Sequence, residues 1–223
     1  MYLSQLILNP LDRQARLDMS NPYEMHRSLM HGFPSPLSAD ERILFRLETM
    51  GRNGAAPVVL IQSVFSPDWS PLANRENYLL QRPAVKSLEA LQFRPGQVLQ
   101  FRLRANPSKR NPKTGKREGI YGLEDRLAWL QRKAGQGGFT IADGALNIHE
   151  ADFRSFTARK KVASAKPASG EALTSQEIPL TVNMVDYEGY LEIRDTVKFF
   201  EGLKLGIGPA KGLGCGLLSL ARA

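Results

Sequence analysis

Two side chains that can exchange protons lie three residues apart near the start of the chain. Tyr23 and His26 stand in the segment NPYEMHR, which predicts a helix, so the phenol and the imidazole should project from the same face. An imidazole titrates near neutral pH and can act as a general acid or base under physiological conditions. The pair is therefore a candidate site of proton transfer.

The alternative for His26 is a packed or solvated histidine, which is the commoner role of a single histidine on a helix. The sequence holds three histidines, so few imidazoles are available for acid–base chemistry, and this favours a catalytic role for His26. His31 lies about 140° around the helix from His26 and near its end, where a solvated role is expected. His149 falls in a strand-like segment as a surface residue. If the chain performs acid–base chemistry on a phosphodiester, His26 is the favoured imidazole.

Local signals define the helix that would hold this pair. Asn21 is a good N-cap, and Pro22 suits the first helical position. Gly32 and Pro34 follow, and both residue types commonly end a helix. The helix should therefore begin at residue 22 and give the phenol and the imidazole a fixed direction.

The charge of the chain is basic and unevenly distributed. There are 30 Lys and Arg against 22 Asp and Glu, for a formal net charge of +8. No acidic residue lies between Arg94 and Arg117, or in the second basic stretch at 153–170. Solvated surfaces usually mix both signs, so the distribution favours nucleic-acid phosphates as partners. The first stretch supplies the candidate nucleic-acid-binding residues Arg102, Arg104, Lys109, Arg110 and Lys113.

The second basic stretch follows an extended run and precedes a segment rich in Ser, Ala and Gly. It is typical of a β-hairpin tip with a basic edge, and the alternative is a solubilising loop. Lys and Arg at such a tip would hold phosphates. The candidates here are Arg159, Lys160 and Lys161.

A glycine-rich segment, GIGPAKGLGCG, precedes the last apolar run of the chain. Glycine at this density weakens a fold unless the backbone needs unusual dihedral angles or another group must approach it closely. Bare amides beside Lys211 could meet phosphate oxygens, whereas the alternative is a tight helix-to-strand turn. The segment matches neither a P-loop nor the dinucleotide fingerprint. The candidate phosphate-binding residues are Gly206, Gly208, Gly212, Gly214 and Lys211.

The spacing of apolar residues predicts two copies of a β-α-β-β-α-β pattern. The first copy consists of strands at 2–9, 42–50, 56–65 and 97–105, with helices from residue 21 and at 75–81. After a basic linker, the second consists of extended segments at 118–122, 138–143, 145–161, 178–193 and 216–223, with helices at 123–135 and 195–206. The sequence therefore predicts the α+β class, with two tandem ferredoxin-like (βαββαβ) domains at 1–110 and 111–223.

Composition excludes several classes of protein. The single cysteine, Cys215, excludes an internal disulfide, and the three scattered histidines show no metal-ligand spacing, so neither a metal nor another cofactor is expected. No apolar stretch approaches the length of a membrane span, and the first residues lack the pattern of a signal peptide. A cytoplasmic protein is expected.

Several segments taken together resemble one known family. They are MYLSQLILNP, NPYEMHR, PVVLIQSVFSPDW, GQVLQFRLRANPSKR with TGKR, and GIGPAKGLGCGLLSLA. In this order they resemble CasE, the endoribonuclease family that processes CRISPR repeats in type I-E systems. The resemblance covers essentially the whole chain, and the combination of NPYEMHR with the terminal glycine loop is its most specific part.

The resemblance implies a function and roles for individual residues. Such enzymes cut precursor CRISPR RNA without a metal at the base of each repeat hairpin, by attack of a ribose 2′-hydroxyl on the adjacent phosphate. It implies that His26 is the catalytic histidine and Tyr23 its companion. The basic hairpin tip would grip the stem beside the cut, and the glycine-rich loop would lie at the RNA. The expected partners are the repeat RNA hairpin, retained after the cut, and the other protein subunits of the type I-E effector complex.

The competing hypothesis is a non-catalytic RNA-binding or assembly subunit. The sequence lacks the RNA-recognition signature K/R-G-F/Y-G/A-F-V-x-F/Y, which disfavours reading of bases by stacking on a sheet. Cleavage of a repeat hairpin by the purified chain would separate the two hypotheses.

Overall fold

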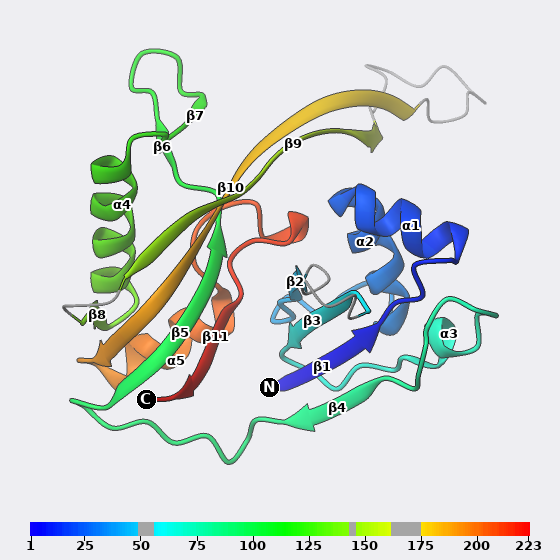
Figure 1. Cartoon of the computed structure of the whole chain (residues 1–223), viewed down its shortest axis with the longest axis horizontal. Coiled ribbons are helices and arrows are strands. Elements are labelled where there is room, and N and C mark those ends of the chain that lie inside the picture. Colours follow the sequence, from blue (N-terminus) through cyan, green and yellow to red (C-terminus); the bar gives the residue numbers. More distant parts are fainter. Residues whose placement is uncertain (49–55, 143–145, 162–174) are drawn as a thin grey trace.

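Two β-sheets lie side by side in the computed structural model, and each packs against its own helices (Figure 1). The structure describes residues 1–48, 56–142, 146–161 and 175–223, and it describes the backbone alone for 150–161 and 175–179. Both ends of the chain lie in the lower half of the view in Figure 1. Among the described residues, the helices are too short or too polar to cross a bilayer.

The first sheet is built in the strand order β2-β3-β1-β4, with each neighbouring pair antiparallel. Its elements are β1 (Tyr2–Ile7), α1 (Arg13–Ser20), α2 (Pro22–Leu29), η1 (Met30–Gly32), β2 (Leu44–Glu48), β3 (Val58–Ser63), α3 (Ser70–Ala73) and β4 (Ala84–Ser87). Without α1 and η1 the order is β-α-β-β-α-β, so this half has the ferredoxin-like arrangement that the sequence predicted.

The second sheet repeats the arrangement, in the order β11-β5-β10-β8. Its elements are β5 (Val98–Ala105), α4 (Leu123–Gln136), β8 (Phe139–Ile141), β10 (Ser175–Ile193), α5 (Thr196–Leu205) and β11 (Leu218–Arg222). Strand β9 (Asn147–Lys161) pairs with β10, and the two extend well beyond the sheet toward the side on which α1 and α2 lie (Figure 1). The α+β class with two ferredoxin-like repeats is therefore confirmed.

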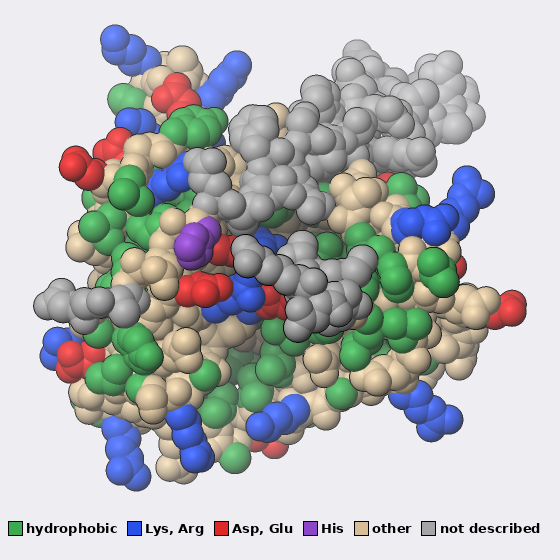
Figure 2. Space-filling model, in the orientation of Figure 1, with side chains coloured by type: hydrophobic (Ala, Val, Ile, Leu, Met, Phe, Trp, Pro, Cys, Tyr) green, Lys and Arg blue, Asp and Glu red, His purple; other side chains and the backbone are tan. Residues whose placement is uncertain are grey.

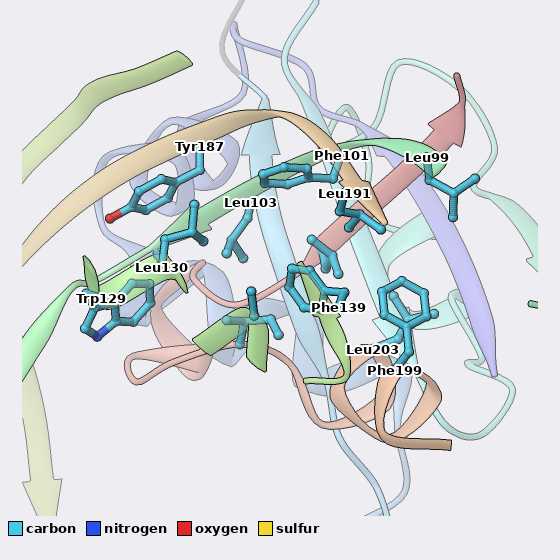
Figure 3. Packing of buried hydrophobic residues seen from close by; sticks show 14 of the residues in the cluster. Leu99, Phe101, Leu103, Trp129, Leu130, Phe139, Tyr187, Leu191, Phe199 and Leu203 are labelled. Atoms are coloured by element: carbon cyan, nitrogen blue, oxygen red, sulfur yellow. The ribbon is translucent and has the colours of Figure 1, made fainter. Parts of the chain in front are cut away.

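Each domain has its own hydrophobic core. In the second domain α4 and α5 cover the sheet, and Trp129 of α4 stacks on Tyr187 of β10 with ring centroids 6.1 Å apart (Figure 3). In the first domain Met25 and Leu29 anchor α2 in the core. Packing thus fixes one face of α2 and leaves the other to face the second domain.

Three predicted elements differ from the structure. The strand predicted at 97–105 forms, but as β5 it lies between β10 and β11 in the second sheet, and β4 takes its place in the first. We therefore propose a domain boundary between Ser87 and Val98 rather than at residue 110. The helix predicted at 75–81 is wrong, because Asn77 has a φ of 61° and the Tyr78 hydroxyl is drawn into the core to donate to Asp18.

The basic linker is also structured, in place of the predicted strand at 118–122. Strand β6 (Ser108–Arg110) pairs with β7 (Arg117–Gly119) as a separate two-stranded hairpin. Asn111 stabilises its turn, because its side-chain oxygen accepts from the backbone amides of Lys113 and Thr114. The hairpin stands beside α4, away from α2 (Figure 1).

Hydrogen bonds across the domain interface set how α2 meets the second domain. Arg46 of β2 is 1% exposed and donates to the carbonyl of Leu217 and the hydroxyl of Ser219, both in the second domain. Gln62 of β3 donates to the carbonyl of Leu203 at 2.7 Å. Because the bonds to the carbonyls of Leu217 and Leu203 are buried, breaking the interface would leave polar groups unsatisfied, which favours a fixed relative position of the domains.

Candidate active site

Helix α2 presents the pair that the sequence singled out. As predicted, the helix begins after Asn21, whose side-chain oxygen accepts from the amide of Tyr23 at 3.0 Å. Tyr23 and His26 are both half-buried and lie one turn apart on the helix. On the next position of the helix, the carboxylate of Glu24 pairs with the Arg27 guanidinium at 2.8 Å.

The environment of His26 favours its neutral form. The imidazole stacks on Phe45 of β2, with ring centroids 6.3 Å apart and the planes at 19°. Its Nδ1 atom is buried and has no hydrogen-bond partner among the described residues. Burial lowers the pKa of His26 below its ordinary value, so the neutral imidazole, which can accept a proton, predominates at neutral pH.

The glycine-rich loop returns to this histidine from the far end of the chain. Its 3₁₀ turn η2 (Lys211–Leu213) packs against α2 and β2 (Figure 1). A methyl group at Gly212 would lie 3.8 Å from Nε2 and from Cε1 of His26, so the loop backbone forms one wall of the site. Larger side chains would fill the space beside the imidazole. The close approach that the glycine content suggested is therefore present.

Gly206 carries the strictest backbone requirement in this loop. Its φ of 76° and ψ of 157° lie in a region that is essentially restricted to glycine, and an added Cβ would lie 2.8 Å from both δ-carbons of Leu44. We expect Gly206→Ala to lower the free energy of unfolding by about 1–3 kcal/mol. Guanidinium titration with a fluorescence readout measures this change.

Gly135→Ala is the matched control for this substitution. Gly135 lies within α4 and nothing surrounds its Cβ position within 4 Å, so alanine should stabilise the helix by roughly 0.5–1 kcal/mol. Equal effects of the two substitutions would contradict the backbone constraint at Gly206.

The remaining candidates for chemistry lie elsewhere. His31 is exposed in η1, and His149 is exposed on β9. Cys215 is fully buried, and burial raises the pKa of its thiol to about 12, so it is no nucleophile at neutral pH. Within the described ranges no three His, Cys, Asp or Glu side chains come together as metal ligands.

Two predicted RNA-binding residues, Arg102 and Arg104, pair with carboxylates of the protein itself. Arg104 binds Asp186 through two bonds of 2.8 Å and donates to the carbonyl of Leu47. Arg102 pairs with Glu48 at 2.8 Å and contacts Asp186 at 3.3 Å. Both lie on the polar face of β5, and β2 of the first domain borders this face. We therefore leave them out of the RNA-binding set proposed below.

The other basic candidates lie on two hairpins. Lys109, Arg110 and Lys113 are exposed on and beyond β6, where Figure 2 shows basic side chains projecting at the upper left. They stand apart from α2. Arg159, Lys160 and Lys161 end β9, and their backbone pairs with Glu177, Gln176 and Ser175. Their side chains lie outside the described part of the structure.

Sequence reasoning missed Phe45, the ring on which His26 stacks. It lies in β2, where a buried aromatic residue is ordinary, so the sequence carries no signal for its contact with the imidazole. Lys211 was identified, and the structure brings it beside the helix that carries His26.

Comparison with known proteins agrees with the resemblance seen in the sequence. The family described as "CRISPR associated protein" matches residues 1–222. The chain belongs to this family. A curated relative, the CRISPR-associated endoribonuclease Cse3 of Thermus thermophilus, is 40% identical over 99% of this chain and 100% of its own length. The CRISPR system Cascade subunit CasE of Escherichia coli is 31% identical over 99% of both chains.

The family likeness extends to three dimensions. A solved structure of the CRISPR endoribonuclease Cse3 bound to 19 nt RNA superposes with a TM-score of 0.80, at 40% identity and with all of both chains covered. The whole chain, including α2 and the glycine-rich loop, therefore has the architecture of that protein.

Proposed function

We propose that the chain is an endoribonuclease that cuts precursor CRISPR RNA at the base of the repeat hairpin. The observation that carries this proposal is the junction of α2 with the glycine-rich loop. It places a half-buried, neutral imidazole against bare backbone in a chain 40% identical to a protein named an endoribonuclease. Such a site suits a bound phosphodiester, because small residues leave room beside the general base.

In this mechanism the substrate supplies the nucleophile. The oxygen of the ribose 2′-hydroxyl forms a bond to the adjacent phosphorus while the bond from phosphorus to the 5′-oxygen of the next nucleotide breaks. The leaving 5′-oxygen takes a proton from the solvent, so the products are a 2′,3′-cyclic phosphate and a 5′-hydroxyl. His26, neutral at rest, accepts the proton of the 2′-hydroxyl. Tyr23, on the same helix, orients the reacting ribose phosphate. The Lys211 ammonium offsets the negative charge that develops on the phosphate oxygens.

Binding requires contacts on both sides of this site. We assign the stem of the hairpin to Arg159, Lys160 and Lys161 at the end of β9, which extends toward the side of α2. The phosphate at the cut lies against the loop formed by residues 206–216, including Gly206, Gly208, Gly212 and Gly214. Lys109, Arg110 and Lys113 on the β6–β7 hairpin would add further phosphate contacts.

We further propose that the chain keeps its product and joins an effector complex in the cytoplasm. This rests on the relative from Escherichia coli, which is named a subunit of Cascade and matches this chain over 99% of its length. The partners would be the mature CRISPR RNA and the other subunits of a type I-E complex.

The proposal predicts cleavage in the presence of excess EDTA. A 2′-hydroxyl is already positioned next to the phosphorus, so no metal-activated water is needed. The purified chain is incubated with a hairpin RNA carrying the CRISPR repeat encoded beside its gene, and the ends of the products are analysed. We expect a cyclic phosphate and a 5′-hydroxyl. Cleavage that needs Mg²⁺ and leaves a 5′-phosphate would refute the mechanism, and tight binding without cleavage would favour the non-catalytic subunit.

A further inference from the structure

A basic pocket of about 510 Å³ adjoins the glycine-rich loop in the second domain. Its walls come from α4, α5, the first residues of β6 and β7, and the first half of the loop. Among its lining residues one carboxylate, Glu201, faces five cationic side chains. These are Arg117, Arg132, Lys133, Lys198 and Lys211.

The charges in this basic pocket are close to one another and only partly compensated. Burial, and then the charges of Arg132 and Arg117, lower the pKa of Lys133. Burial, and then the charges of Arg42 and Lys133, lower the pKa of Lys211. Positive charges held this close repel one another, and an anion bound between them offsets the repulsion.

A buried hydroxyl also lines the basic pocket. Ser108 is 8% exposed, and its Oγ atom has no hydrogen-bond partner among the described residues. A buried hydroxyl without a partner costs free energy, so a ligand that accepts its hydrogen bond would be stabilised there. A phosphate oxygen is such an acceptor, and it also satisfies the surrounding cations.

The basic pocket and the candidate active site share one loop. Lys211 lines the pocket, and its neighbour Gly212 forms the wall beside His26. In Figure 1, α4 and the far end of the β9–β10 hairpin lie on opposite sides of the contact between α2 and η2. A strand that passes His26 from the side of that hairpin therefore meets the basic pocket next.

We infer that the basic pocket binds phosphates of the single-stranded RNA that continues beyond the cut, away from the hairpin. The inference rests on the proposed function, and it adds Arg117, Arg132, Lys133, Lys198 and Ser108 to the residues that contact RNA. An acidic protein segment would also match the charge. RNA is favoured because the pocket continues directly from the wall of the site that holds the reacting phosphate.

The test compares two RNAs that differ in length beyond the cut. Both carry the repeat hairpin with a 2′-deoxyribose at the cut, which blocks the reaction; one ends just after the cut, and the other continues for about six nucleotides. The wild-type chain should bind the longer RNA roughly tenfold more tightly, with a salt dependence steeper by about 0.7 for each phosphate contacted. Arg132→Ala combined with Lys133→Ala should remove most of this difference.

Two further variants separate a specific site from general charge. Arg82→Ala with Lys86→Ala removes two exposed cations near β4, outside the pocket, and should leave the difference between the two RNAs unchanged. Ser108→Ala keeps the net charge and should reduce the difference. Equal binding of the two RNAs by the wild-type chain, or a full difference in the Arg132/Lys133 variant, would overturn the inference.

Two arms of the experiment identify the source of any failure. In the first arm the extension is placed on the 5′ side of the hairpin, where Arg132 and Lys133 should add no affinity. If this RNA does bind more tightly, and Arg132→Ala with Lys133→Ala removes that gain in affinity, the assignment of the pocket to the strand beyond the cut is wrong. The shorter RNA with an ordinary ribose at the cut tests the proposed function alone. If the wild-type chain leaves it uncut, the proposed function fails independently of the pocket.

Discussion

His26→Ala is expected to lower the single-turnover rate of RNA cleavage by about 10²- to 10⁴-fold. The imidazole is held between Phe45 and Gly212, and it is the histidine that the structure places at the loop. Loss of a positioned proton acceptor raises the barrier by roughly 3–5 kcal/mol. Hairpin affinity should change little, because basic side chains elsewhere hold the phosphates. Single-turnover rates and dissociation constants on the same repeat hairpin measure both effects.

Two matched variants make this result specific. His31→Ala removes an exposed histidine a short distance along the chain and should cleave at the wild-type rate. Tyr23→Phe keeps the ring and loses the hydroxyl, so its loss of rate should be smaller than that of His26→Ala. Near wild-type cleavage by His26→Ala would show that the assignment is wrong. Joint loss of folding and cleavage, seen in the thermal unfolding of the variant, would return His26 to the role of a packed histidine.

The helix that carries this pair could be predicted because its signals are local. Asn21 caps it and Pro22 opens it, and both act within one turn of the helix. The approach of Gly212 to His26 could not be predicted in the same way. Nearly the whole chain separates the two residues, and the sequence indicated only that something would approach the glycines closely.

The alternation of apolar residues also could not predict which strands pair with one another. The alternation in 97–105 shows that a strand forms, but the same alternation suits either sheet, and β5 pairs with β10 and β11. The same limit explains why Arg102 and Arg104 were predicted to bind RNA although the structure pairs them with carboxylates. The alternation of apolar and polar residues in 97–105 puts both on the polar face of a strand, whereas their neutralisation by Asp186 and Glu48 depends on tertiary contacts with β10 and β2.

The second large effect is expected from a change in the substrate. A 2′-deoxyribose immediately before the cut removes the nucleophile, and attack by water lacks the advantage of a nucleophile held within the same molecule. Well-oriented intramolecular groups act at effective concentrations of about 10⁵ M or more. Water is present at roughly tens of molar, so the cleavage rate should fall by at least about 10³-fold. The rest of the RNA keeps its phosphates, so its affinity should stay close to that of the ribose substrate.

The single-turnover cleavage of this deoxy-substituted hairpin is the most direct test of 2′-hydroxyl attack. A hairpin with the deoxyribose one position further into the stem serves as the control, because it keeps the nucleophile and should be cut normally. The account predicts that the RNA substituted at the cut is bound and left intact, while the control RNA and the all-ribose RNA are cleaved. Cleavage of the RNA substituted at the cut at a rate near that of the all-ribose RNA would mean that water is the nucleophile, and it would contradict the central claim.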